Sequence, residues 1–304
     1  MVSFFKPVLP LIITVVMLLI TAYPVAAHDG GTSGGLWHHW VWQDLPLLIL
    51  IGGVYTLGLH SLWKRAGTGS GISRGRATMF GLGLIVLFVA LISPLDFLSE
   101  VLFAAHMVQH LLVMLVAAPL FVLGRFTLAV AWAFPPRWSS KIWKGWKGKY
   151  AWNFLTRPVS AFLLHNAAIW IWHMPRLYEA SLHNEWLHFL EHASFFLTAF
   201  LFWQVFAELT ENVRMGRSAK FGMGIFMNFG TMLASGFLGV LLTFSPYVWY
   251  PTHIHETALY GLTALEDQQL AGAIMWVPSG VVYVASVLGV LGRWLFAMEA
   301  LENP

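Results

Sequence analysis

Long runs of apolar residues, separated by short polar or basic loops, fill most of the chain. Seven of these runs approach the roughly 20 residues that a helix needs to cross the hydrocarbon core of a bilayer. They cover about residues 45–63, 77–94, 101–124, 158–174, 186–208, 222–244 and 269–297. Hydrophobic residues make up 58% of the chain and charged residues only 10%, which is too little charge for the surface of a soluble domain. The pattern therefore predicts an all-α, polytopic membrane protein with about seven transmembrane helices.

A further apolar stretch, Val8–Tyr23, precedes these runs and has the features of a signal peptide. Lys6 supplies a positive charge before it, and Val25–Ala27 resembles the small-residue site at which such peptides are cleaved. We therefore expect residues 1–27 to be a signal peptide, with an uncleaved first helix as the alternative. Residues 28–304 would then form the seven-helix membrane domain.

The basic residues predict the orientation of the helices. Nearly all of the 17 lysines and arginines fall in the first, third and fifth loops or at the C-terminal end, and the net charge is only +3. The intervening loops carry acidic residues instead, among them Asp96, Glu100 and Glu256. Because loops rich in lysine and arginine stay in the cytoplasm, we expect the mature N-terminus outside and the C-terminus in the cytoplasm. Confinement to these loops also argues against a nucleic-acid-binding surface.

Histidines gather on one side of the membrane in this topology. All but one of the 13 histidines fall at its outer face. Two pairs, His106/His110 and His188/His192, are spaced by four residues, so each pair shares one helix face and can chelate one ion. His173 ends a third span on the same side. Because imidazole is costly to place near hydrocarbon, the cluster predicts a metal centre near the outer face.

Composition narrows the choice of metal. The chain has no cysteine, which excludes disulfides, thiolate copper sites and cysteine-ligated iron–sulfur clusters. Met107, Met174 and Met275 fall at a depth similar to that of the histidines, and thioethers suit Cu(I), although methionine also serves as a packing residue. Asp267, at the start of the last span, can act as a ligand or orient an imidazole. The candidate ligands are His106, His110, His173, His188, His192, Asp267 and Met275.

Other interpretations of the histidines stay open. Residues 188–192 match the H-x-x-E-H pattern of inverted zinc proteases, in which Glu191 would act as the general base. Haem ligation is a second alternative, but two histidines four residues apart on one helix cannot ligate opposite faces of one haem. Histidines also serve as hydrogen-bonding groups between helices or as interface anchors without any metal. This last interpretation applies most to His38, His39, His253 and His255.

Five motifs, in order along the chain, resemble the CtaG-like family of cytochrome c oxidase assembly proteins, the multi-span membrane kind. They are Ser93–Asp96, Ala105–Leu112, Trp170–Pro175, Trp186–His192, and Asp267–Gly272 continuing into Met275–Pro278. The resemblance covers about residues 45–295. It implies a protein of the bacterial cytoplasmic (inner) membrane that takes part in the maturation of haem–copper oxidases and is not an enzyme.

The resemblance also implies copper as the cargo. A protein of this kind would bind Cu(I) at the outer membrane face and deliver it to the apo-oxidase copper centre in subunit I or II. The positions that match are His106, His110, His173, His188, His192 and Asp267. The expected partners are the lipid bilayer, an oxidase subunit and a copper donor that the sequence does not identify. The alternative within the same pathway is a scaffold that stabilises an oxidase subunit without binding metal.

Overall fold

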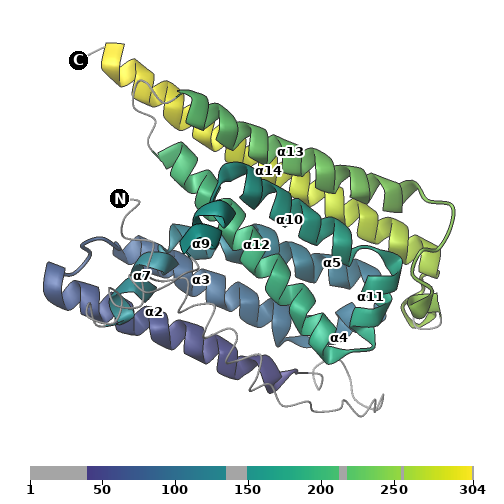
Figure 1. Ribbon diagram of the computed structural model, residues 1–304. Helices are drawn as coiled ribbons and strands as arrows, with labels where there is room; N and C mark the ends of the chain where they lie inside the picture. Colours follow the sequence, from purple (N-terminus) through teal and green to yellow (C-terminus); the bar gives the residue numbers. More distant parts are fainter. Residues whose placement is uncertain (1–39, 135–148, 212–217, 255–256, 303–304) are drawn as a thin grey trace.

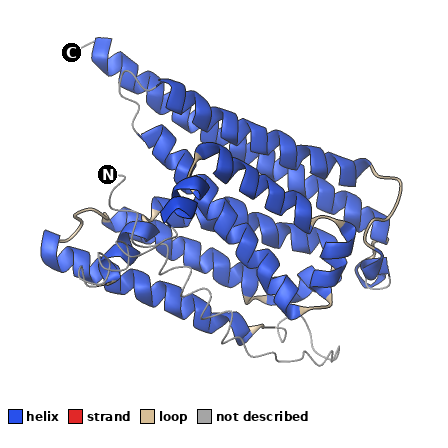
Figure 2. Ribbon diagram, viewed as in Figure 1, coloured by secondary structure: helices blue, strands red, loops and turns tan. Residues whose placement is uncertain are grey.

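The structure of the protein is a computed structural model that describes residues 40–134, 149–211, 218–254 and 257–302. Within these ranges all regular structure is helical and no strand is present (Figure 2). The predicted all-α class is therefore confirmed. The predicted signal peptide, residues 1–27, lies outside the described residues.

Apolar helices run along the length of the molecule (Figure 1). They are α2 (Leu45–Ala66), α3 (Arg74–Leu91), the continuous α5 (Phe103–Leu111), η3 (Leu112–Ala117) and α6 (Ala118–Leu123), α10 (Pro158–Trp172), α12 (Glu185–Glu211), α13 (Ser218–Phe244) and α14 (Ala264–Glu302). Among the described residues, 6 helices are long and apolar enough to cross a membrane, whereas α10 has only 15 residues. A polytopic helical membrane protein is thereby confirmed, with α10 shorter than the predicted span 158–174.

Short helices close the two ends of the bundle. At one end lie α4 (Pro94–Val101) and α11 (Pro175–Leu182), whereas α7 (Phe126–Ala133) and α9 (Lys149–Leu155) lie towards the other end (Figure 1). Helix α7 packs closely against α2, where a Cβ on Gly58 would collide with the Ala129 carbonyl oxygen. The predicted spans end at residue 124 and resume at residue 158, so helix α7 was not predicted; its eight residues are too few to cross a bilayer.

The hydrophobic interior has two parts that meet at α12. One part is built mainly from α5, α10, α12, α13 and α14, and the other from α2, α3 and α7. The η3–α6 segment contributes side chains to both. Large apolar side chains are also exposed on the outer surface, including Leu57, Phe226 and Val281. Helices that are apolar on all sides are typical of a membrane-embedded bundle, because lipid replaces water around them.

The helix that carries the first histidine pair changes its winding at η3, a π-helix. Pro119 follows it and has no backbone N–H, so the Met114 carbonyl finds no donor five residues on. The Trp203 indole of α12 donates to that carbonyl instead, at 3.0 Å. This hydrogen bond fixes α12 against the α5–η3–α6 helix, and these two helices carry both histidine pairs.

Candidate metal centre

Helices α5 and α12 bring both histidine pairs to one place. The ring centroids of His106 and His110 lie 4.1 Å apart, and those of His188 and His192 lie 4.4 Å apart. Between the helices, His110 lies 5.3 Å from His192 and His106 lies 6.0 Å from His188. The four imidazoles therefore form one cluster, close to α4 and α11.

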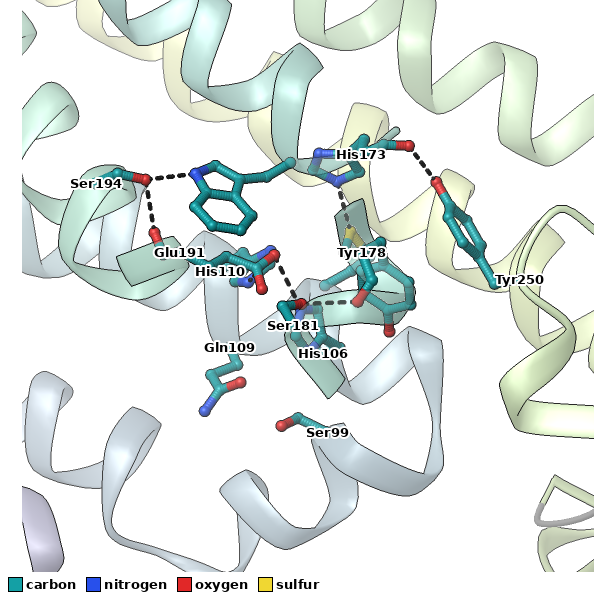
Figure 3. Close-up of polar contacts among 12 residues, drawn as sticks. Ser99, His106, Gln109, His110, His173, Tyr178, Ser181, Glu191, Ser194 and Tyr250 are labelled. Atoms are coloured by element: carbon teal, nitrogen blue, oxygen red, sulfur yellow. Dashed lines mark hydrogen bonds and ion pairs between the residues drawn. The ribbon is translucent and has the colours of Figure 1, made fainter. Parts of the chain in front are cut away.

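Glu191 of α12 lies against the histidine pair of α5 (Figure 3). Its Oε1 atom is 3.5 Å from Nε2 of His106 and 3.6 Å from Nε2 of His110. The three donor atoms all lie within 4.8 Å of one another, and all three side chains are buried. These separations exceed those of a normal hydrogen bond. They suit three ligands arranged around one cation.

The polar atoms of the cluster have few partners of their own. No hydrogen-bond partner among the described residues satisfies either nitrogen of His110 or Nε2 of His188 and His192. The ring of His106 faces the backbone of Ser99. The Ser181 hydroxyl donates to the Tyr178 carbonyl at 2.8 Å and also lies against the Glu191 carboxylate (Figure 3). Each buried polar atom without a partner costs about 1–3 kcal/mol, so natural proteins rarely retain such groups. A bound cation would satisfy several of them at once, and the residues therefore fit a metal ion.

A chain of hydrogen bonds holds the turn of α12 that carries Glu191 (Figure 3). The Trp172 indole at the end of α10 donates to the Ser194 hydroxyl at 2.7 Å. Ser194 in turn donates to the backbone carbonyl of Glu191 at 2.9 Å. Helix α10 thereby fixes the position of the carboxylate relative to the two histidines of α5.

Asp267 supports the cluster from a distance. Its Oδ2 accepts from the Phe103 N–H at 2.7 Å and its Oδ1 from the Ala104 N–H at 3.0 Å. Helix α5 needs this carboxylate, because its own N-cap residue, Leu102, makes no side-chain cap. The structure thus joins Asp267 to the start of the helix that carries His106, and not to the imidazoles themselves.

His173 and Met275, the two other candidate ligands, differ in position. The His173 ring lies 6.2 Å from that of His110, and its Nε2 lies 3.4 Å from the sulfur of Met107. Met275 lies in the hydrophobic core, and in the part of the chain that the structure describes no hydrogen bond or ring contact joins it to a histidine. The structure brings His173 to the cluster and leaves Met275 outside it.

The other histidines whose side chains the structure describes lie outside the cluster. His165 is buried deeper in α10, where its Nδ1 lies 3.2 Å from the Thr198 hydroxyl. His60 and His183 are exposed. The loop histidines named above as anchors, His38, His39 and His255, fall outside the described residues, and the side chain of His253 is also not described.

Glu191 was considered in the sequence only as a protease base, and its contact with the α5 histidines was missed. A signal for it exists, because Glu191 follows His188 by three residues and so lies on nearly the same helix face. The tyrosine that fixes His173, Tyr250, was also missed: its hydroxyl donates to the His173 carbonyl at 2.8 Å. It follows α13 in a loop that carries no motif.

A cavity of about 170 Å³ opens beside His188 and His192. Its walls are mostly apolar and come from α2, α3, η3, α7 and α12. Acidic side chains also line it: Asp44, Asp96, Glu100 and Glu185. The carboxyl groups of Asp44, Glu100 and Glu185 give the cavity beside the second histidine pair an acidic lining that favours cations.

Asp96 ties the cavity to α5. The Gln109 amide donates to its Oδ1 at 2.6 Å and also to the Ala90 carbonyl at 2.8 Å. Burial raises the pKa of Asp96 to about 8, and the charges of Glu100 and Asp44 act in the same direction, against the hydrogen bond from Gln109. Asp96 therefore holds its proton at neutral pH and joins α4 to α3 and α5 as a neutral group.

Comparison with known proteins agrees with the motifs. The sequence model of the cytochrome c oxidase caa3 assembly factor family (Caa3_CtaG) matches residues 53–296. The chain belongs to this family. The predicted resemblance to CtaG-like proteins is thereby confirmed. No curated protein and no solved structure matches the chain.

Membership of the Caa3_CtaG family makes this protein an assembly factor of cytochrome c oxidase, associated with that oxidase and with the membrane. The matched region contains all five sequence motifs and every residue of the histidine cluster. The buried group His106, His110 and Glu191, which could hold a metal ion, therefore lies inside the matched region.

Proposed function

We propose that this assembly factor binds Cu(I) at the outer face of the bacterial cytoplasmic membrane and delivers it to a copper centre of the apo-oxidase. His106, His110 and Glu191 would hold the ion. The observation that carries the proposal is the convergence of these three buried donor groups, whose ligand atoms lie within 4.8 Å of one another. Cytochrome c oxidase is a haem–copper enzyme, and imidazole is a good ligand for copper.

The arrangement also suits transfer. A closed cage of four ligands holds its metal, whereas a site with three protein ligands keeps a position open for exchange. The Nε2 atoms of His188 and His192 would bind the ion at a second position, between the first three ligands and the acidic cavity, because both residues border that cavity. An ion can thus pass between imidazoles without ever losing all its ligands. Release would follow when oxidase subunit I or II docks and offers its own ligands.

The proposal includes no catalysis. A protease of the H-x-x-E-H type would need Glu191 to activate a water bound to a metal on His188 and His192. Glu191 instead faces His106 and His110 on the neighbouring helix. As a ligand it should be partly replaceable: Glu191→Gln, which keeps one carbonyl donor, should retain some copper binding and some oxidase assembly. Loss of all function with metal binding intact would instead favour a hydrolytic role.

The decisive experiment is copper binding by the detergent-purified protein under reducing conditions. The wild type should bind close to one Cu(I) per chain, and the His106→Ala/His110→Ala variant should lose it. His60→Ala is the matched control, because His60 is exposed on α2. Equal copper in wild type and double variant, both folded, would overturn the proposed site. Zinc in place of copper would reopen the protease alternative.

A second measurement separates a carrier from a scaffold. In cells lacking this protein, excess copper should partly restore oxidase activity if the protein carries copper. It should restore nothing if the protein only stabilises an oxidase subunit. The double variant should behave like the deletion while inserting normally into the membrane, and full oxidase activity in that variant would contradict the proposal.

A further inference from the structure

The contact between His173 and Met107 has no ordinary explanation as a hydrogen bond. Nε2 of His173 lies 3.4 Å from the Met107 sulfur, and both side chains are buried (Figure 3). A thioether can accept a hydrogen but has none to donate. The contact is therefore a hydrogen bond only if the proton of the imidazole is on Nε2.

The other ring nitrogen argues against that arrangement. Nδ1 of His173 lies 2.7 Å from the Ile169 carbonyl oxygen, which can only accept. We therefore assign the proton to Nδ1, which donates to this carbonyl. A proton on Nε2 alone would set two lone pairs against each other at 2.7 Å. A proton on both nitrogens would place a full positive charge in a buried site, which is costly. In the remaining form, Nε2 presents its lone pair to the sulfur.

We infer that His173 and Met107 form a soft, sulfur-containing half-site for Cu(I) beside the His106/His110/Glu191 centre. The inference rests on the proposed copper-carrying function and deepens it. An imidazole lone pair and a thioether lone pair face each other and repel. A soft cation bound between them would replace this repulsion by two favourable metal–ligand bonds. With bonds of about 2.0 Å to nitrogen and about 2.3 Å to sulfur, one ion can bridge donors at this separation.

Both donors are held in place by the fold. His173 is fixed at its Nδ1 by Ile169 and at its carbonyl by the Tyr250 hydroxyl. Met107 follows His106 directly on α5, the helix whose start is capped by Asp267. A metal ligand is often oriented through a hydrogen bond from its second ring nitrogen to a backbone carbonyl, and His173 has this arrangement.

The half-site adds chemical selectivity to the centre. The His110 ring lies 6.2 Å from that of His173, and its own Nε2 lies 3.6 Å from Glu191. His110 is thus close to both donor groups. An ion that moves from one to the other exchanges a carboxylate oxygen for a thioether sulfur. Sulfur favours Cu(I) over Zn(II), whereas the carboxylate and imidazoles accept either, so the exchange would admit copper and disfavour zinc.

The test is X-ray absorption at the copper edge on the purified, Cu(I)-loaded full-length protein. Wild type should show a sulfur neighbour at roughly the 2.3 Å of a metal–sulfur bond. Met107→Leu, which keeps the side-chain volume, should lose it. Met174→Leu is the matched control, because Met174 adjoins His173 but is 58% exposed. Competition titrations should show Cu(I) affinity reduced by about 10-fold in Met107→Leu, in the range typical for residues that support a metal site, with Zn(II) affinity unchanged.

Each outcome separates the inference from the proposed function. Copper bound by nitrogen and oxygen alone in wild type overturns the half-site but leaves copper carrying intact. Sulfur that persists in Met107→Leu overturns the assignment to this residue. No copper in wild type, with the protein folded, overturns the proposed function itself.

Discussion

Asp267 offers a sharp test of how the centre is positioned, because it acts on the histidines through a helix end. Its carboxylate accepts two backbone N–H groups at the start of α5, at 2.7 and 3.0 Å. In Asp267→Asn one oxygen becomes an NH₂ group that faces a backbone donor. One charge-assisted hydrogen bond is then lost, worth about 1.5–3 kcal/mol. The negative charge at a helix N-terminus is lost too, worth up to about 2 kcal/mol in a partly buried site.

We therefore expect Asp267→Asn to lower the free energy of unfolding by about 2–4 kcal/mol, from the sum of these two effects. Thermal unfolding of the detergent-purified protein measures the change. Copper affinity should fall by about 10-fold, since α5 carries His106, but the ligands seen by X-ray absorption should stay the same.

Glu266→Gln is the control for Asp267→Asn, because it removes a negative charge from the same turn. Glu266 is exposed and accepts from the Thr263 N–H and hydroxyl, an arrangement that glutamine can preserve. Unchanged stability in Asp267→Asn would refute the capping role. Loss of a copper-bound oxygen in Asp267→Asn would show that Asp267 is a ligand and not a positioning residue.

Three further predictions concern packing, pH and metal. In Gly272→Ala the new Cβ would lie 2.6 Å from the Gly239 carbonyl oxygen, so the free energy of unfolding should fall by roughly 1–3 kcal/mol. Gly280→Ala is the control, because the space around Gly280 is open, and it should unfold like wild type. The pKa of Asp96 is raised from 3.8 to about 8, so between these pH values the folded state holds a proton that the unfolded state has lost. The free energy of unfolding should therefore fall as the pH rises from 3.8 to about 8. Asp96→Asn should flatten this pH dependence, measured by thermal unfolding. Cu(I) at 100 times its Kd should stabilise the wild type by about 2.7 kcal/mol in the same assay and leave His110→Ala unchanged.

Local spacing in the sequence singled out the two histidine pairs but left open which histidines converge. His106/His110 and His188/His192 are each one helical turn apart, and both spans were predicted to begin on the same side of the membrane. That the two pairs meet depends on the packing of α5 against α12, which the spacing does not specify. The same spans also made the helical membrane fold predictable, since their length is set by the bilayer.

The contacts of the site that the sequence did not predict depend on how each helix is rotated about its axis and on which distant helices pack together. Glu191 reaches the α5 histidines only because α12 is turned so that this face meets α5, and the Trp203 hydrogen bond to η3 helps to fix that turn. Asp267 was a candidate ligand in the sequence because a carboxylate near histidines suits a metal. Its position opposite the uncapped start of α5 depends on the packing of α14, which spacing along the chain does not specify.

The energetics of the centre run against stability in the metal-free protein. Several buried nitrogens lack hydrogen-bond partners, and each costs folding free energy that apolar side chains of similar size would not. The surrounding residues fix the groups of the centre in position, through Ile169 at His173 and through Ser194 at Glu191. Rigid donors with unused lone pairs gain most from a cation, because little ordering remains to oppose binding. The same groups that weaken the metal-free fold therefore provide the driving force for taking up the ion.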